Sequence, residues 1–347
     1  MAPAKQTILM MTGPGEVAFQ ERALPSPGPG DVVVRPRLSS FKHGTEMMAY
    51  KGRSPFAHHG LDPELRIFMD RDEGNPFYPL PMGNMFAGEI EAAGPEVNGF
   101  VAGDLAFGWG PIGNRHILRA NKLEPLGALT PEQALCIDPA SFALGAVLDG
   151  AIESGETVYI TGLGAIGLFA VQYCVARGAH VVASSAFASR RKLAAHFGAE
   201  RVYDSKITDD LARLIKQETG SAHAAIECSG NLSSLHRSIR ALRPCGRVVC
   251  VGFYSPADGH LDLGKEFFHN RISLHASLPA FGVGNPVRTD PPLFAKDLLR
   301  QCAEDFAAGT ISVDGIITPI LPFSEAEETV RLIANEPEAV IKVALRH

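Results

Sequence analysis

The sequence predicts an α/β protein in two parts, a mostly-β domain and a doubly wound parallel sheet. Residues 1 to about 125 are rich in Gly, Pro and short β-like runs, whereas the chain then alternates strand-like and helix-like segments to about residue 280. A glycine-rich turn near residue 162 joins a predicted strand to a predicted helix, which is typical of a βαβ unit. A length of 347 residues and a hydrophobic content of 46% suit two domains with ordinary cores.

Short β-like runs make up the first part of the chain. They cover residues 31–38, 87–94 and 104–108, and turn signals lie at residues 27–30 and at Gly94-Pro95. We expect these runs to form the strands of one compact domain.

A helix is predicted to begin at Pro131. Thr130 is suited to be its N-cap, proline is favoured at the first helical position, and Gln133 completes a capping box with Thr130. The alternation that follows predicts a parallel sheet. Later elements are expected at residues 181–183, 190–197, 201–203, 209–218, 224–227, 232–242, 246–252 and 272–277, and a helix-rich stretch from residue 292 ends in a strand at 339–345.

The glycine-rich turn follows the β-rich run Thr157–Thr161 and carries the pattern G-x-G-x-x-G at Gly162, Gly164 and Gly167. Gly162 permits a sharp turn, Gly164 permits close approach of a pyrophosphate, and Gly167 permits close packing of helix on strand. The helix start supplies N–H groups and a positive dipole end for the phosphate charge. We therefore expect a dinucleotide to bind at Gly162, Gly164, Ala165, Ile166 and Gly167.

The end of the second strand indicates which dinucleotide is bound. NAD enzymes place an acid there for the ribose hydroxyls, whereas NADP enzymes offer arginine to the 2′-phosphate. Here the strand ends at Ser184 and Ser185 without an acid, and Arg190 and Arg191 follow. This pattern favours NADP, while NAD stays open because an arginine pair at a helix start is often only solvated.

Composition and charge point to small-molecule partners. A formal net charge of −6 and a pI near 6.1 provide no basic surface for nucleic acid or acidic lipid. The sequence lacks an apolar run long enough for a membrane span, and the apolar run at the N-terminus is too short for a signal peptide. The six cysteines show no metal or disulfide spacing, so we expect them to be reduced in a cytoplasmic protein.

Several motifs together resemble the medium-chain dehydrogenase/reductase superfamily, nearest its sorbitol and threonine dehydrogenase branch. They are His43-Gly44-Thr45-Glu46, the segment 83–88, Gly103-Asp104, Asp138-Pro139 and the glycine fingerprint. The resemblance implies a GroES-like catalytic domain at 1–127 and 285–347, a Rossmann domain at 128–284, and a catalytic cleft where they meet. It also implies a homodimer or homotetramer, paired through the edge strand expected at 271–278.

The sequence departs from that family at the zinc ligands. His43 stands where zinc members carry cysteine, Asn84 replaces histidine, and Met85 replaces the acid, although Asp138 keeps a carboxylate. A stable zinc site needs three or four good N, S or O donors. Residues 107–123 contain no cysteine for a structural zinc. We therefore expect an enzyme without zinc.

Without a metal, a protein group must exchange the proton of the substrate alcohol. By resemblance, His43 occupies the position that faces the nicotinamide, and imidazole can act as acid or base near neutral pH. Thr45 matches the hydroxyl relay of the family, and Glu46 or Asp138 would orient the imidazole. The alternative is that His43 is a partly buried histidine that bonds only to backbone.

Three other histidines compete for such a role. His58 and His59 lie in an insertion-like stretch at 51–81, where adjacent histidines are mostly solvated, and His269 precedes the last strand expected in the Rossmann domain.

Three functions are compatible with this pattern. The first is a zinc-independent oxidoreductase that transfers hydride between NADP(H) and a secondary alcohol or ketone of a sugar- or polyol-like molecule. The second is a zinc-free enoyl or quinone reductase acting on an activated C=C bond, and the third is a non-catalytic NADP-binding sensor. Aromatic side chains that would line an apolar pocket in the second are Phe56, Phe77, Tyr78, Phe86 and Trp109.

Overall fold

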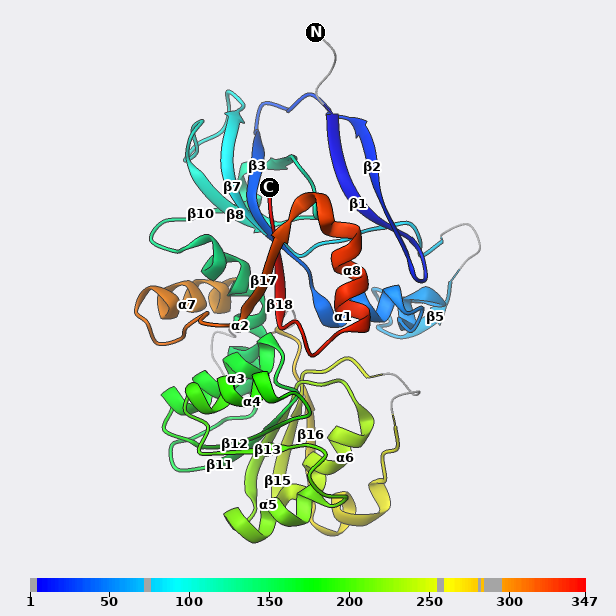
Figure 1. Ribbon diagram of the computed structural model, residues 1–347, viewed down its shortest axis with the longest axis vertical. Coiled ribbons are helices and arrows are strands. Elements are labelled where there is room, and N and C mark those ends of the chain that lie inside the picture. Colours follow the sequence, from blue (N-terminus) through cyan, green and yellow to red (C-terminus); the bar gives the residue numbers. More distant parts are fainter. Residues whose placement is uncertain (1–4, 72–75, 255–258, 280–281, 284–294) are drawn as a thin grey trace. The chain divides into compact units, whose positions relative to one another are not determined.

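The computed structural model describes residues 5–71, 76–254, 259–279, 282–283 and 295–347 (Figure 1). They fold as two compact units, of which unit 1 comprises residues 1–135 and 317–347 and unit 2 comprises residues 136–316. No helix in the described part of the chain is long and apolar enough to cross a membrane.

Unit 1 is mostly β, as the sequence predicts. Its sheets have the orders β2-β1-β6, β4-β5 and β10-β8-β7-β3-β18-β17, with β9 also paired to β3. The strands are β1 (Lys5–Gly13), β2 (Glu16–Ala23), β3 (Asp31–Ser40), β4 (His59–Leu61), β5 (Phe68–Asp70), β6 (Leu80–Pro81), β7 (Met85–Ala93), β8 (Leu105–Trp109), β9 (His116–Arg119), β10 (Leu123–Pro125), β17 (Ile317–Pro322) and β18 (Lys342–Arg346). Its helices are α1 (His43–Tyr50) and α8 (Ala326–Asn335), with short 3₁₀ turns at Pro55–Ala57, Ala120–Lys122 and Phe323–Glu325.

The C-terminal segment joins the first part of the chain in unit 1, because β18 pairs antiparallel with β3, with Ala344 opposite Ser40 (Figure 1). The helix α8 buries Ala326, Val330 and Ile333, which recur at helical spacing along one face. They pack into a core with residues of β1, α1 and β18. This packing fixes α1 and β18 next to each other, and both contribute to the site described below.

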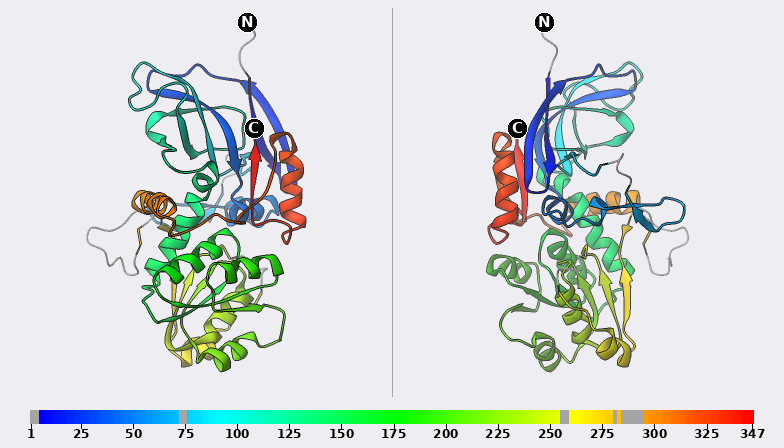
Figure 2. Two further views of the ribbon diagram at one scale, coloured as in Figure 1. Left: turned by 60° about the vertical axis from the view of Figure 1, so that its left-hand side comes forward. Right: turned by 90° about the vertical axis from the view of Figure 1, so that its right-hand side faces the viewer.

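Unit 2 contains a parallel sheet covered by helices (Figure 2). Its strand order is β13-β12-β11-β14-β15-β16. Helices alternate with its strands, and α3 packs beside α4 while α5 packs beside α6. The elements are α2 (Pro131–Asp149), β11 (Thr157–Thr161), α3 (Ala165–Ala176), β12 (His180–Ser185), α4 (Ala188–His196), β13 (Arg201–Asp204), α5 (Leu211–Thr219), β14 (Ala222–Glu227), α6 (Leu232–Ala241), β15 (Leu242–Cys250), a π-helical turn η4 (Leu263–Phe267), β16 (Ser273–Ala276) and α7 (Ala295–Ala307).

The strand order places a topological switch point between β11 and β14. From β11 the chain continues outward to β12 and β13, and then returns to the other side of β11 for β14, β15 and β16. In open parallel sheets, ligands bind outside the carboxyl ends of the strands at such a point. A ligand is therefore expected at the loops after β11 and β14.

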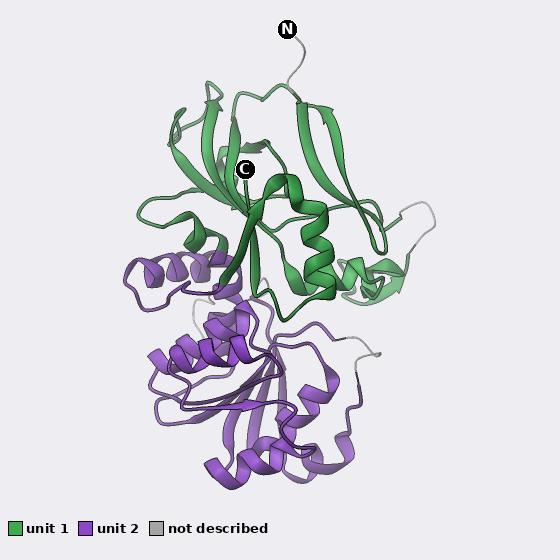
Figure 3. Cartoon of the chain, viewed as in Figure 1, with its two compact units in different colours: residues 1–135, 317–347 green, residues 136–316 purple. Residues whose placement is uncertain are grey.

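The two units are bounded differently from the predicted domains (Figure 3). The first boundary lies at 135/136, inside α2, rather than at 127/128. The predicted second boundary, 284/285, lies outside the described residues, and the units divide again at 316/317. Residues up to 316 group with unit 2 because α7 packs on α3, with a ring contact between Phe169 and Phe306.

The capping box predicted at the start of α2 is confirmed. The Thr130 N–H donates to Gln133 Oε1 at 2.8 Å, and the Gln133 N–H donates to Thr130 Oγ1 at 3.2 Å. The N–H groups at a helix start have no intrahelical partner, and the capping box supplies a side-chain acceptor to two of them.

Candidate functional site

The glycine fingerprint lies at the switch point of unit 2, between β11 and α3. Gly162 has φ +86°, and a Cβ there would overlap the backbone of Ser229. A Cβ on Gly167 would overlap the Gly162 carbonyl, so both positions require glycine. Gly164 is the N-cap of α3 and has open space around it and no side-chain cap. Its surroundings fit a pyrophosphate, because the first-turn N–H groups of Ala165 and Ile166 have no intrahelical acceptor.

Residues 228–231 and 251–254, here called the second wall, follow β14 and β15 on the other side of the switch point. Gly230 has φ +68°, and a Cβ there would lie 2.7 Å from the Phe253 carbonyl oxygen. The sequence analysis did not assign this wall. One signal was present, because Glu227 ends the apolar run of β14 and Ser229-Gly230 follows it.

Glu227 is a buried carboxylate that bonds to the second wall. It accepts hydrogen bonds from the N–H of Ser229 (2.8 Å), the Ser229 hydroxyl, the N–H of Gly230 (3.1 Å) and the hydroxyl of Tyr254 (2.7 Å). Burial raises the pKa of Glu227, and the hydrogen bonds from Ser229, Tyr254 and Gly230 oppose that rise.

Ser184 lies at the end of β12. Its hydroxyl is fully buried and lies 2.7 Å from the Tyr159 hydroxyl and 3.3 Å from Thr161 Oγ1. The Ser184 hydroxyl therefore already has partners inside the sheet, and its contact with a 2′-phosphate stays a prediction. Ser185 is the next residue and accepts the Phe187 N–H on its hydroxyl at 3.2 Å.

The two arginines after β12 lie in different surroundings. Arg191 donates to the Ser185 carbonyl at 2.7 Å and forms an ion pair with Asp204 at 3.0 Å. Arg190 instead holds its guanidinium over the ring of Phe187, 4.6 Å from the centroid. The positive charge of Arg191 is thus balanced by Asp204, whereas Arg190, at the start of α4, stacks on Phe187 and is our candidate for a 2′-phosphate.

In unit 1, His43 is the first residue of α1 and its Nε2 accepts the Val343 N–H of β18 at 3.1 Å. The neutral ring therefore carries its proton on Nδ1. Thr45 is exposed in the same helical turn. The contact with backbone expected as an alternative is present, and it fixes the orientation of the imidazole.

Glu46 connects α1 to the loop before β7. Its carboxylate accepts the Lys42 N–H at 2.6 Å and the Gly83 N–H, and the adjacent Asn84 donates its N–H to the Ser40 carbonyl at 2.8 Å. Burial raises the pKa of Glu46, while the two backbone N–H groups and nearby Lys342 and Lys42 oppose that rise. The segments that carry His43 and Asn84 are thereby held together.

Lys342 also belongs to this group of residues, here called the His43 cluster (His43, Glu46, Asn84 and Lys342). It was not predicted from the sequence. It is buried on β18, next to Val343, and donates to the Phe41 carbonyl at 3.2 Å. Its ammonium group also stabilises the ionised form of Glu46. A buried lysine in the apolar strand 339–345 was the available signal.

The other predicted residues lie in separate places. Asp138 is buried on α2, within unit 2. His59 forms an ion pair with Asp70 on the small β4-β5 hairpin, and His58 immediately precedes that hairpin. His269 is exposed before the amino end of β16, the end of the sheet opposite to the switch-point loops, so it does not line the cofactor crevice.

The residues at the positions where zinc members of the resembled family carry ligands do not suit a zinc ion. Nε2 of His43 and both oxygens of Glu46 accept backbone N–H groups, Met85 is fully buried, and Asn84 is a weak neutral donor. Throughout the described residues, no group of three or more His, Cys, Asp and Glu side chains is arranged to hold a metal ion. We derive no chemistry through zinc.

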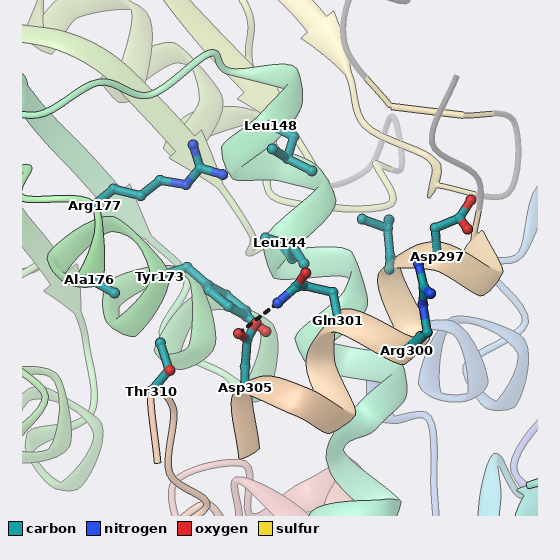
Figure 4. A pocket seen from close by; sticks show the side chains of 11 residues that line it. Leu144, Leu148, Tyr173, Ala176, Arg177, Asp297, Arg300, Gln301, Asp305 and Thr310 are labelled. Atoms are coloured by element: carbon teal, nitrogen blue, oxygen red, sulfur yellow. Dashed lines mark hydrogen bonds between the residues drawn. The ribbon is translucent and has the colours of Figure 1, made fainter. Parts of the chain in front are cut away.

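A cavity of about 400 Å³ lies between α2, α3 and α7 (Figure 4). Leu144 and Leu148 line it together with Tyr173, Arg177 and Asp305. Arg177 caps the carboxyl end of α3, so this cavity lies away from Gly164 at the other end of the helix. The cavity therefore does not include the glycine fingerprint.

Comparisons with known proteins agree with this geometry. A family model for zinc-binding dehydrogenases matches residues 165–280. The chain is 30% identical over 342 residues to D-guloside 3-dehydrogenase of Escherichia coli (strain K12), an alignment that covers 95% of each sequence.

Solved structures confirm the predicted fold class. The structure of 2R,3R-butanediol dehydrogenase from Bacillus subtilis matches with a TM-score of 0.78 and 18% identity, covering 99% of both chains. A candidate zinc-binding dehydrogenase from Sinorhizobium meliloti 1021, bound to NADP, matches with a TM-score of 0.76 and 20% identity over 99% of this chain and 100% of that one.

Proposed function

The chain belongs to the zinc-type medium-chain dehydrogenase/reductase superfamily, and from this premise we propose that it transfers hydride between NADP(H) and a secondary alcohol or ketone of a sugar- or polyol-like molecule. Membership makes the chain an NAD(P)-dependent oxidoreductase. The observation that carries the substrate class is the 30% identity, over 95% of the chain, to a dehydrogenase of a sugar glycoside.

The switch-point loops of unit 2 would hold the cofactor. Gly162, Gly164 and Gly167 allow backbone approach to the pyrophosphate, and the first turn of α3 supplies N–H donors. Ser185 and Arg190 would recognise the 2′-phosphate. When bound, the nicotinamide ring supplies the hydride donor or acceptor.

His43 would act at the substrate oxygen. Since Nε2 accepts the Val343 N–H, the imidazole offers its Nδ1 proton to a carbonyl or alkoxide oxygen. Carbonyl reduction uses this tautomer directly, whereas alcohol oxidation requires Nδ1 to take a proton and the ring to change tautomer. Thr45 lies in the same turn and would relay the proton, and the negative charge of Glu46 or Asp138 would stabilise the imidazolium.

We also propose that this chemistry proceeds without zinc and in the cytoplasm. The supporting observation for the first is the donor set, in which Asn84 and Met85 stand at ligand positions. The supporting observation for the second is the set of six cysteines, all of them free thiols.

The test is a substrate screen with the purified chain. We expect NADPH to form when NADP⁺ is mixed with glycosides, sugars or polyols that bear a ring or chain secondary hydroxyl. Elemental analysis should give well under one zinc per chain, and a chelator should leave the rate unchanged. Stoichiometric zinc that is lost together with activity would contradict the zinc-free mechanism.

Two other outcomes of that screen would contradict the proposed reaction itself. Turnover only with an activated C=C bond would indicate the enoyl or quinone reductase, but that function is disfavoured because Phe86 is fully buried against His116. Tight NADPH binding without turnover on any compound would indicate a sensor.

A further inference from the structure

We propose that Glu227 is a positioning residue for the nicotinamide half of the cofactor, because its buried carboxylate sets the shape of the second wall. The inference rests on the proposed function, since it assumes a bound nicotinamide dinucleotide. It assigns a role to a residue outside the glycine fingerprint and outside the His43 cluster.

The hydrogen bonds of Glu227 all converge from the second wall. Oε1 accepts the N–H and the hydroxyl of Ser229, and Oε2 accepts the N–H of Gly230 and the hydroxyl of Tyr254. The side chain is 0% exposed, and these four donors are neutral. A buried carboxylate is costly without such bonds, so the conformation of the wall and the ionised side chain depend on each other.

The backbone of Glu227 joins the two loops of the second wall. Its carbonyl accepts the N–H of Val251 at 2.9 Å and the N–H of Gly252 at 3.1 Å. A Cβ on Gly252 would overlap Gly230 and lie 2.8 Å from Glu227 Oε2. The loops after β14 and β15 are therefore packed backbone to backbone around this residue.

The same wall supports the fingerprint turn. Gly162 lies so close to Ser229 that a Cβ would overlap the Ser229 amide. The Ser229 N–H is also the donor that Glu227 Oε1 accepts at 2.8 Å. A change in the carboxylate would thus move the edge of the crevice that faces Gly162.

The position of Glu227 in the sheet predicts which half of the cofactor is affected. In a doubly wound sheet the first three strands bind the adenosine half, and the strands beyond the switch point bind the other mononucleotide. Ser185 and Arg190 belong to the first set, whereas Glu227 ends β14 in the second. A Glu227 variant should therefore lose nicotinamide contacts and keep adenosine contacts.

The experiment compares two ligands on Glu227→Gln. The amide keeps the size of the side chain but replaces one carboxylate oxygen, which accepts two hydrogen bonds, by an NH₂ group. An NH₂ group in place of Oε2 would face the N–H of Gly230, which is itself a donor and cannot accept a hydrogen bond. We expect the Kd for NADPH to rise about tenfold, the effect of one lost charge-assisted hydrogen bond. The Kd for adenosine 2′,5′-bisphosphate, which carries only the adenosine half, should change less than about twofold.

Two further variants remove hydrogen-bond donors to Glu227 and keep its carboxylate. Tyr254→Phe removes one of the four donors and should weaken NADPH binding less than Glu227→Gln does. If Glu227→Gln does not fold, Ser229→Ala with Tyr254→Phe removes both hydroxyl donors while the carboxylate stays, and it should weaken NADPH while sparing the adenosine fragment.

The outcomes separate this inference from the proposed function. An equal loss of affinity for both ligands would indicate general destabilisation. Unchanged affinity for both would show that the carboxylate does not position the second wall. Either result would overturn the inference without affecting NADPH binding by the unmodified chain. Absence of NADPH binding by the unmodified chain would overturn the proposed function first, and this inference with it.

Discussion

His43 is held by a contact that limits its chemistry. Because Nε2 accepts the Val343 N–H, only Nδ1 can exchange a proton with a substrate in this tautomer. We predict that His43→Ala lowers kcat by about 10² to 10⁴, the effect of removing a general catalyst, and leaves the Kd for NADPH unchanged. Steady-state rates on the best substrate of the screen, with calorimetry for NADPH, would measure both quantities.

Thr45→Val serves as the comparison for that variant. Thr45 is exposed in the same turn and is proposed only to relay the proton, so its loss should cost less than the loss of His43. Full activity in His43→Ala would transfer the proton-exchange role to Asp138 or Glu46.

Arg190 and Arg191 contact different neighbours at the start of α4. Arg190 stacks on Phe187, whereas Arg191 pairs with Asp204. We predict that Arg190→Ala raises the Kd for NADPH by about 10- to 100-fold, the effect of one lost phosphate contact, and leaves NADH nearly unaffected. Ser185→Asp should reverse the preference, since a carboxylate repels the 2′-phosphate and accepts from ribose hydroxyls.

Lys192→Ala is the matched control, because Lys192 is exposed on the same helix. Tighter binding of NADH than NADPH by the unmodified chain would show that the arginine assignment is wrong.

Sequence patterns predicted which residues form the candidate site better than they predicted the contacts of those side chains. The glycines were identifiable because their conformations and close contacts exclude other residues. The hydroxyl contact of Ser184 was not predictable, because the partner of a strand side chain depends on the neighbouring strand, here Tyr159 of β11. Lys342 was missed because it reaches Glu46 only through the pairing of β18 with β3, across about 300 residues of chain.

At the scale of elements, unit 1 has histidines at two strand ends, of which His116 is buried whereas His347 is an exposed residue whose ring packs on its neighbours. His116 starts β9 and stacks on Phe86, and His347 follows β18 and stacks on Phe323. Burial lowers the pKa of His116 to about 3, with a smaller effect from His347, and it lowers the pKa of His347 to about 4. Both rings are therefore neutral in the folded protein at neutral pH.

The sign of the pH dependence follows from these lowered values. An unfolded histidine has a pKa of about 6.5, so the stabilising contribution is present above that pH and is lost as pH falls toward 4 and then 3. We predict that the free energy of unfolding drops by a few kcal/mol over this interval, mainly because of buried His116, since solvent screens the charge of exposed His347. Urea unfolding at a series of pH values would measure it.

His116→Phe should make that drop smaller. Phenylalanine keeps the ring contact with Phe86, removes the titrating group, and removes a buried Nε2 that has no hydrogen-bond partner among the described residues. His196→Gln, on the exposed end of α4, should leave the pH profile unchanged. An equal acid sensitivity in His116→Phe and the unmodified chain would contradict this cause.

At the scale of the whole molecule, the sequence predicted both architectures, and the domain boundaries at 127/128 and 284/285 stay a prediction beside units that divide at 135/136 and 316/317. Periodicity and glycine spacing identify a β-rich part and a parallel sheet, because each depends on local patterns. The boundary at 316/317 depends on the packing of α7 against α3 through Phe306 and Cys302, which no local pattern reveals.

Among the described residues, β16 is an edge strand of the sheet in unit 2, and this edge carries our prediction of assembly. β16 ends the strand order, and the Ser277 N–H donates to the Cys250 carbonyl of β15 at 2.9 Å. By alternation, the N–H of Ala276 faces away from β15, toward the open edge. Exposed Leu278 lies next to this edge, so an unpaired β16 would invite association. We predict a homodimer, or a homotetramer built from it, that pairs through β16, and light scattering at micromolar concentration should detect it.

Ala276→Pro tests which edge is used. Proline removes the outward N–H and leaves the inward hydrogen bonds of β16 in place, and His275 before it is already extended, as the residue before a proline prefers. The variant should scatter light as a monomer with its fold retained by circular dichroism, whereas Ala276→Ser, which keeps the N–H, should stay associated. A monomeric unmodified chain would contradict the assembly, and a folded Ala276→Pro dimer would place the contact on another surface.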